Sequence, residues 1–138
     1  MIGAEKLILI GCLLQGALGG EWAVWMPQSV EALSGSCVLI PCRFNIPSNW
    51  EKYLPETTVQ WLCEKDDTVM FDSKSQSESH LQGTFTGDLQ RKNCTTLLEN
   101  LPKRACDKCF LRLHEPIKWT YWWSFLELNI TGSALSGQ

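Results

Sequence analysis

The sequence predicts an all-β fold in which two sheets enclose one core. Short runs rich in β-branched and aromatic residues alternate with turn residues, and little helical periodicity interrupts them. Beyond its N-terminal segment the chain has roughly 110 residues, the size of one such sandwich domain. A weak further strand is expected in the polar segment 73–90, and a loop at 45–55. The main strands are expected at 22–26, 36–44, 58–64, 68–73, 93–99, 108–114 and 119–130.

The N-terminal segment has the pattern of an export signal. A polar start is followed by an apolar run at 7–14, too short to span a bilayer, and by small residues at 17–19. We therefore expect a signal peptide (1–19), one domain (20–131) and a short tail (132–138). No later run is apolar for long enough to cross a membrane, so the expected location is secreted or at the cell surface without its own anchor.

Cysteine usage and net charge narrow the class of protein. In a short exported chain six cysteines indicate a disulfide framework. Glycosylation sequons at Asn93 and Asn129 indicate the same compartment. The formal net charge of −3 argues against nucleic acid or an anionic membrane surface as a partner. The cysteines that follow the signal are Cys37, Cys42, Cys63, Cys94, Cys106 and Cys109.

Enzymatic function is not expected. No nucleophile or glycine-rich phosphate loop accompanies His80 and His114, the two histidines, so we expect no cofactor. Cys63, Cys106, Cys109 and His114 would supply four zinc ligands. However, there is one C-x-x-C pair, and export favours oxidation, so we expect disulfides and no metal.

Alternation along the strands assigns the core, because successive side chains point to opposite faces. Trp61 is expected to be the large side chain buried between the sheets, whereas Phe110, Arg112 and His114 point outward. The four inward sets are Val38, Ile40 and Cys42; Val59, Trp61 and Cys63; Cys94, Thr96 and Leu98; and Cys109, Leu111 and Leu113.

Several segments in order resemble the N-terminal domain of the siglecs, the sialic acid-binding immunoglobulin-like lectins. They are 21–27 (EWAVWMP), 37–44 (CVLIPCRF), 87–98, 110–112 (FLR) and 118–121 (KWTY). The likeness covers nearly all of 22–131 and implies a V-type immunoglobulin-like β-sandwich. It also implies a disulfide between Cys42 and Cys94 within one sheet, since Leu111 stands where an antibody-like domain has its second cysteine.

The resemblance implies a ligand, the terminal sialic acid of a glycoprotein or glycolipid. Arg112 is implied to bind the carboxylate, because a guanidinium offers a planar fork of donors that matches it. Trp119 is implied to pack against the glycerol tail. A slip of one residue in register would turn Trp122 to that face instead.

Further contacts are implied around this centre. Trp22 resembles the aromatic residue that meets the N-acetyl methyl group, with Trp25 as the alternative, although Trp25 is expected in the core. Lys118 is expected near the glycerol tail, and the backbone around Tyr121 is expected to hydrogen-bond the glycerol and N-acetyl groups. The competing hypothesis is a V-type domain that docks another protein through the same face without lectin activity.

Four cysteines remain after Cys42 and Cys94 are paired. The resemblance implies that Cys37 bonds to a following immunoglobulin domain, so we expect the chain to be part of a longer, membrane-anchored receptor. Parity turns both Cys63 and Cys109 inward, so a bridge between them is the preferred pairing, and Cys106 at the corner before 108–114 is the alternative partner of Cys63.

Overall fold

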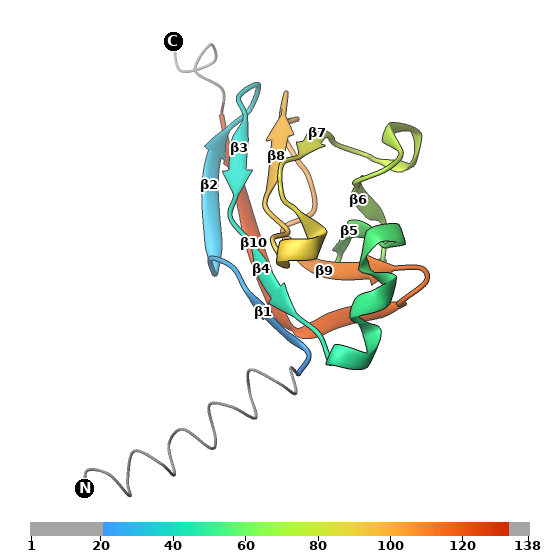
Figure 1. The fold of residues 1–138 in the computed structure, drawn as a ribbon. Coiled ribbons are helices and arrows are strands. Elements are labelled where there is room, and N and C mark those ends of the chain that lie inside the picture. The colour runs from blue at the N-terminus through green and yellow to red at the C-terminus, as the bar shows by residue number, and fades with distance from the viewer. Residues whose placement is uncertain (1–20, 133–138) are drawn as a thin grey trace, which may run out of the picture.

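A computed structural model describes residues 21–132, whose strands form two facing layers (Figure 1). The expected signal peptide (1–19) and the tail beyond Gly132 lie outside these residues. Within 21–132, no helix has the length and apolar character needed to cross a bilayer.

The larger sheet has five strands in the order β2-β10-β9-β5-β6. These are β2 (Ser29–Leu33), β10 (Trp119–Thr131), β9 (Lys108–His114), β5 (Thr58–Cys63) and β6 (Val69–Asp72). The opposite side has a three-stranded sheet in the order β3-β8-β7 and a two-stranded sheet, β1-β4. Their strands are β3 (Val38–Ile40), β8 (Thr96–Glu99), β7 (Gln82–Phe85), β1 (Ala23–Trp25) and β4 (Arg43–Asn45).

The first strand region divides between the two sides of the sandwich. β1 pairs antiparallel with β4, and β2 pairs in parallel with the end of β10. Pro27 lies between β1 and β2 and has no N–H for a ladder, which favours the break. Pro41 likewise separates β3 from β4. Sequence reasoning expected a single strand at 22–26 and did not find β2.

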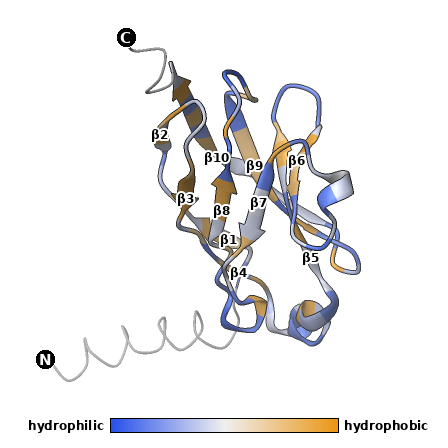
Figure 2. Ribbon diagram, turned by 90° about the horizontal axis from the view of Figure 1, so that it is seen from above, coloured by the Kyte–Doolittle hydropathy of each residue, from blue (hydrophilic) through white to orange (hydrophobic). Residues whose placement is uncertain are grey.

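The predicted core is confirmed for the four central strands. Trp61 is 2% exposed, and its indole N–H donates to the Thr96 hydroxyl across the sandwich at 2.9 Å. All the residues of the four inward sets are buried except Val38, which is partly buried against the same core. Figure 2 shows hydrophobic residues gathered in the strands and hydrophilic residues in many of the connecting loops.

A shift in register divides β10 into two halves. Thr120 pairs with Arg112 of β9, but the next pair is Phe125 with Phe110, so four residues of β10 face a single residue of β9. This bulge reverses the alternation. In the first half the odd-numbered Tyr121 points inward, whereas in the second half the even-numbered Leu126 and Leu128 are buried.

The segment expected as a loop at 45–55 is instead largely a 3-10 helix, η1 (Ser48–Glu56). Its Leu54 is 3% exposed and joins the core, which accounts for ordered structure in a segment with two prolines. Two shorter 3-10 turns follow, η2 (Gln76–Glu78) and η3 (Leu89–Arg91).

The disulfides agree with one expectation and correct another. Cys42 bonds to Cys94, as the resemblance implied. Cys63 bonds to Cys106 and not to the preferred Cys109. The corner segment before β9 (residues 100–107) brings the Cα atoms of Cys63 and Cys106 to 5.5 Å, within the range that a disulfide spans. Within residues 21–132, Cys37 and Cys109 have no disulfide partner; Cys37 is exposed and Cys109 is buried.

Candidate functional site

Arg112 lies in the middle of β9, the central strand of the larger sheet, on the face that points away from the core. Its neighbours Leu111 and Leu113 are fully buried, whereas Arg112 is partly exposed. It pairs with Gln60 of β5 and with Thr120 of β10. Because directly paired residues share a face, these three side chains form a polar row across the outer face of the sheet.

No carboxylate pairs with the guanidinium among the described residues. Gln60, opposite Arg112, donates from Nε2 to Asp72 Oδ2 at 2.8 Å. The other oxygen of Asp72 accepts from the backbone N–H groups of Lys74 and Ser75 at 2.8 and 3.0 Å. The nearest acid in the row is therefore occupied by neutral donors, and buried Arg112 Nε has no protein hydrogen-bond partner.

Trp119 and Trp22 are brought together in the structure. Their rings stack with centroids 4.0 Å apart and planes 15° apart. Trp119 pairs with the inward-facing Leu113, so by register it starts on the core side of β10, not on the Arg112 side. Its indole nitrogen is buried and has no protein partner. One ring face of each tryptophan is thus occupied by the other.

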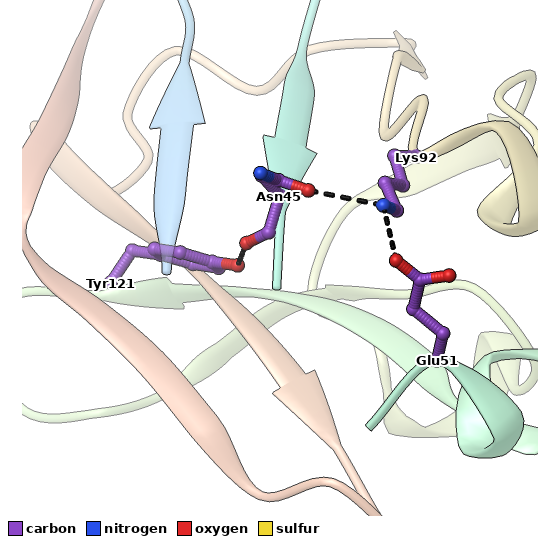
Figure 3. A network of polar contacts seen from close by, with 4 residues as sticks. All are labelled: Asn45, Glu51, Lys92 and Tyr121. Carbon is purple, nitrogen blue, oxygen red and sulfur yellow. Dashed lines mark hydrogen bonds and ion pairs between the residues drawn. The ribbon is translucent and has the colours of Figure 1, made fainter. Parts of the chain in front are cut away.

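The side chain of Tyr121 is a core residue. It is fully buried, and its hydroxyl donates to the backbone carbonyl of Asn45 at 2.6 Å. Burial raises the pKa of Tyr121 above that of a free tyrosine. Figure 3 shows the continuation: Lys92 Nζ donates to Asn45 Oδ1 at 3.1 Å and pairs with Glu51 Oε2 at 2.7 Å. This network ties β10 to β4 and η1.

Lys118 and Trp25 lie on exposed positions. Lys118 has a positive φ of 61° in the connection between β9 and β10, and its Nζ is 3.5 Å from Glu115 Oε2. Such a solvent-exposed pair holds a side chain only weakly. Trp25 is 59% exposed, so the expectation that it belongs to the core is wrong. β1 turns the Trp25 side chain outward, whereas Trp22, which precedes β1, packs against the core.

An aromatic cluster that sequence reasoning did not assign to the site lies on the same outer face as Arg112. Phe110, two residues before Arg112, contacts Trp122 at 5.0 Å and Phe125 at 6.1 Å between ring centroids. Trp122 is 54% exposed. Trp123 is 57% exposed but packs edge-on against Trp119 and Tyr121 instead. The bulge thus places adjacent tryptophans in two different environments.

The two sequon asparagines differ in their surroundings. Asn129 is exposed on β10. Asn93 is partly buried, and its side-chain oxygen accepts from the Thr95 N–H at 3.0 Å. Asn93 also pairs through its backbone with Asp88, in a tight turn beside Cys94. Of the two, Asn129 has the more accessible amide.

The two facing layers of strands, with the first strand region divided between them as β1 and β2, define a V-type immunoglobulin-like domain. Human myelin-associated glycoprotein is 32% identical over 120 residues, covering 81% of this chain and 19% of that protein. Human sialic acid-binding Ig-like lectin 9 is 28% identical, covering 77% of this chain and 25% of its own length. No family model matches. The chain belongs to the siglec family, as the sequence resemblance indicated, and spans about a fifth of the length of myelin-associated glycoprotein.

Solved structures agree on the fold. The first Ig domain of mouse polymeric immunoglobulin receptor superposes with a TM-score of 0.58 at 15% identity, covering 81% of this chain and 96% of that chain. The fold is therefore an immunoglobulin-like sandwich.

Proposed function

We propose that the chain is a lectin domain that binds terminal sialic acid of glycoproteins or glycolipids on the outer face of β9 and β10. The observation that carries the proposal is the unpaired Arg112 guanidinium. It lies on a rigid central strand, has no acidic partner among the described residues, and has a buried Nε without a protein acceptor. The relatives named as sialic acid-binding lectins support the same ligand.

The chemistry of the ligand fits this position. A sugar carboxylate supplies two acceptor oxygens in the plane that a guanidinium recognises. A hydrogen bond of this charged kind contributes about 1.5–3 kcal/mol, and an unsatisfied buried donor costs a similar amount. A bound carboxylate would therefore add charged hydrogen bonds to Arg112 and would also give its Nε the acceptor that the protein does not supply.

Aromatic surface on either side of Arg112 would contact the rest of the sugar. Trp122 offers an exposed ring on the same face, and Thr120, directly opposite Arg112, offers a hydroxyl. Trp119 starts on the core side of β10, so Trp119 and Trp22 would reach the sugar only through the ring surface that their stacking leaves free. Lys118 and the backbone around Tyr121 complete the proposed set, at the start of β10.

The test compares Arg112→Ala and Arg112→Lys with the wild type on sialylated glycans presented at high density, where avidity compensates for weak single-site binding. We expect roughly 10- to 100-fold weaker binding for alanine, the loss of one charged hydrogen-bond set. Lysine should restore little, because it keeps the charge but not the fork. Arg91→Ala is the matched control, since Arg91 is a highly exposed arginine paired only with Asp88. Sialidase treatment of the target should abolish wild-type binding. Binding that survives both the Arg112→Ala substitution and the sialidase treatment would contradict the proposal.

A second function is supported by the aromatic cluster of Phe110, Trp122 and Phe125. A partly exposed apolar patch on a V-type face is the kind of surface that docks another protein. This hypothesis predicts that a protein partner is retained by Arg112→Ala and is insensitive to sialidase. The same two assays therefore separate the two functions.

We further propose that the chain acts outside the cell, after removal of residues 1–19, with glycans on Asn129 and Asn93. In this setting the domain would serve adhesion or cell-surface recognition as one part of a longer receptor. Mass determination of the secreted product, with and without glycosidase, tests cleavage and glycan occupancy; retention of Met1 in the secreted chain would overturn the first claim.

A further inference from the structure

Three cysteines gather where β5 ends and β9 begins. Cys63 is the last residue of β5, and Cys109 is the residue directly opposite it on β9. Cys106 precedes β9 in the corner segment and forms the disulfide with Cys63. Neither the proposed lectin site nor the second disulfide, Cys42–Cys94, uses this cluster.

The register brings the Cys109 thiol close to this disulfide. The Glu64 N–H donates to the Lys108 carbonyl at 2.9 Å, so Glu64 and Lys108 form a hydrogen-bonded pair. The next pair, Cys63 and Cys109, is therefore of the non-hydrogen-bonded type, in which Cα atoms are about 4.5 Å apart and side chains approach closely. That separation lies within the range that a disulfide spans. Both side chains face the core and are 4% exposed.

We propose that Cys63, Cys106 and Cys109 form an internal thiol–disulfide exchange site in which Cys109 displaces Cys106 from Cys63. Cys109 loses its proton and attacks Cys63 Sγ, forming a new S–S bond. The bond between Cys63 and Cys106 breaks, its electron pair goes to Cys106 Sγ, and Cys106 takes up a proton. One disulfide and one thiol are present before and after, so no oxidant or reductant is required.

Burial of Cys109 controls the rate of this exchange. The thiolate is the attacking species, and desolvation, assisted by the negative charge of Asp107, raises the pKa of Cys109 to about 12. At neutral pH very little thiolate is present, so the exchange is slow. Its rate should rise about tenfold per pH unit while the pH remains well below that pKa.

The exchange changes what the corner segment exposes. In the starting form Cys106 ties the corner to β5; afterwards the bridge joins β5 directly to β9, and Cys106 is a free thiol. Cys106 is partly exposed and lines a hollow of about 180 Å³ with Lys65, Asp107 and Lys108. A released Cys106 is therefore reachable by small reagents and by other thiols, whereas Cys109 in the starting form is not.

The experiment follows the bridges in the full chain carrying Cys37→Ser, which removes the exposed thiol. The protein is incubated with iodoacetamide between about pH 7.5 and pH 9.5, quenched with acid and digested with trypsin. Cleavage at Lys52, Lys65, Arg104, Lys108 and Arg112 places the three cysteines in separate peptides, 53–65, 105–108 and 109–112. We expect alkylated 105–108 to accumulate together with 53–65 bonded to 109–112, about tenfold faster per pH unit.

Two further variants complete the test. Cys109→Ser should keep the bridge from Cys63 to Cys106 and show no alkylation of Cys106 at any pH. Cys106→Ser should form the bridge from Cys63 to Cys109, so that neither of these cysteines reacts with a thiol reagent after unfolding. The proposal is overturned if wild-type alkylation falls only on 109–112, or if the bridge found joins 105–108 to 109–112. Two free thiols in folded Cys106→Ser would overturn it equally.

Discussion

Trp22 and Trp119 stack with their ring centroids 4.0 Å apart and join the start of the chain to the start of β10. Trp22 precedes β1, which pairs on one side of the sandwich, and Trp119 begins a strand of the opposite sheet. The stack therefore closes one end of the domain. Trp22 and Trp119 therefore have a structural role that does not depend on whether either of them contacts a sugar.

Trp119→Ala should destabilise the fold, because it removes one ring of the stack and the contacts of Trp119 with Tyr121 and Trp123. We expect a loss of about 2–4 kcal/mol in the free energy of unfolding, measured by denaturant titration. Trp25→Ala is the control, since Trp25 is 59% exposed and should change stability by no more than about 0.5 kcal/mol. Equal effects of the two substitutions would contradict the structural role of the stack.

Trp122 and Trp123 form a matched pair for locating the sugar. They are adjacent and similarly exposed, but only Trp122 packs on Phe110 beside Arg112. Trp122→Ala should weaken binding to sialylated glycans about 5- to 10-fold, the contribution of one aromatic contact, and Trp123→Ala should leave it nearly unchanged. Glycan-array titration of the two variants measures this; the reverse order would place the glycerol tail on the Trp119 side.

Thr120→Glu should block the proposed lectin site. Thr120 is directly opposite Arg112, where Cβ atoms in an antiparallel pair are about 5 Å apart, so a carboxylate there would pair with the guanidinium. We expect binding to fall to the level of Arg112→Ala while the melting temperature stays within a few degrees. Thr120→Gln has the same size without the charge and should retain binding. Loss of binding in the glutamine variant as well would indicate steric exclusion, not competition for Arg112.

Thr96→Val tests the bond that joins the sheets through the core. The Thr96 hydroxyl accepts from the Trp61 indole, and valine would leave that buried N–H without a partner. The expected cost is about 1–3 kcal/mol in the free energy of unfolding. Thr84→Val, on an exposed position of β7, should be close to neutral. A neutral Thr96→Val would show that the indole finds another acceptor.

Alkaline pH should destabilise the domain through Tyr121. The unfolded chain releases the tyrosine proton near pH 10, whereas the folded chain keeps it because burial raises the pKa of Tyr121. Above about pH 10 the unfolded state thus binds fewer protons than the native state, and stability falls by up to about 1.4 kcal/mol per pH unit.

Comparison with Tyr121→Phe, in a Cys109→Ser background, isolates this effect, because the buried Cys109 thiol titrates in the same direction. The phenylalanine variant should be about 1 kcal/mol less stable near pH 8, since it loses the bond to the Asn45 carbonyl. That difference should shrink as the pH rises past 10. A constant difference between pH 8 and pH 11 would contradict the role of Tyr121 ionisation.

Sequence alternation was sufficient for the centre of the fold. β9 begins and ends where it was expected, at Lys108 and His114, and the inward positions around Trp61 are those that parity assigned. β5 and β9 pair without a shift in register, so period-two patterning determines which of their side chains are buried. The position of Arg112 on the outer face follows from the same rule.

The remaining features depend on long-range pairing, which local pattern does not contain. The bulge in β10 faces four residues with one of β9, and no local signal distinguishes Trp122 from Trp123 before that register is known. Cys106 lies outside any strand, so parity favoured Cys109 as the partner of Cys63, whereas the structure forms the bridge from Cys63 to Cys106 in the corner segment. η1 is stabilised by Leu54 in the core, a contact that its proline-containing sequence does not reveal.

The parallel pairing of β2 with the end of β10 has a mechanical consequence. Both strands run in the same direction, from Ser29 to Leu33 and from Glu127 to Thr131. A tether that pulls the N-terminal side of β2 against the C-terminal side of β10 would slide these strands past one another. Their hydrogen bonds would then share the load and rupture together, so the face that carries Arg112 would stay intact until this short ladder gave way.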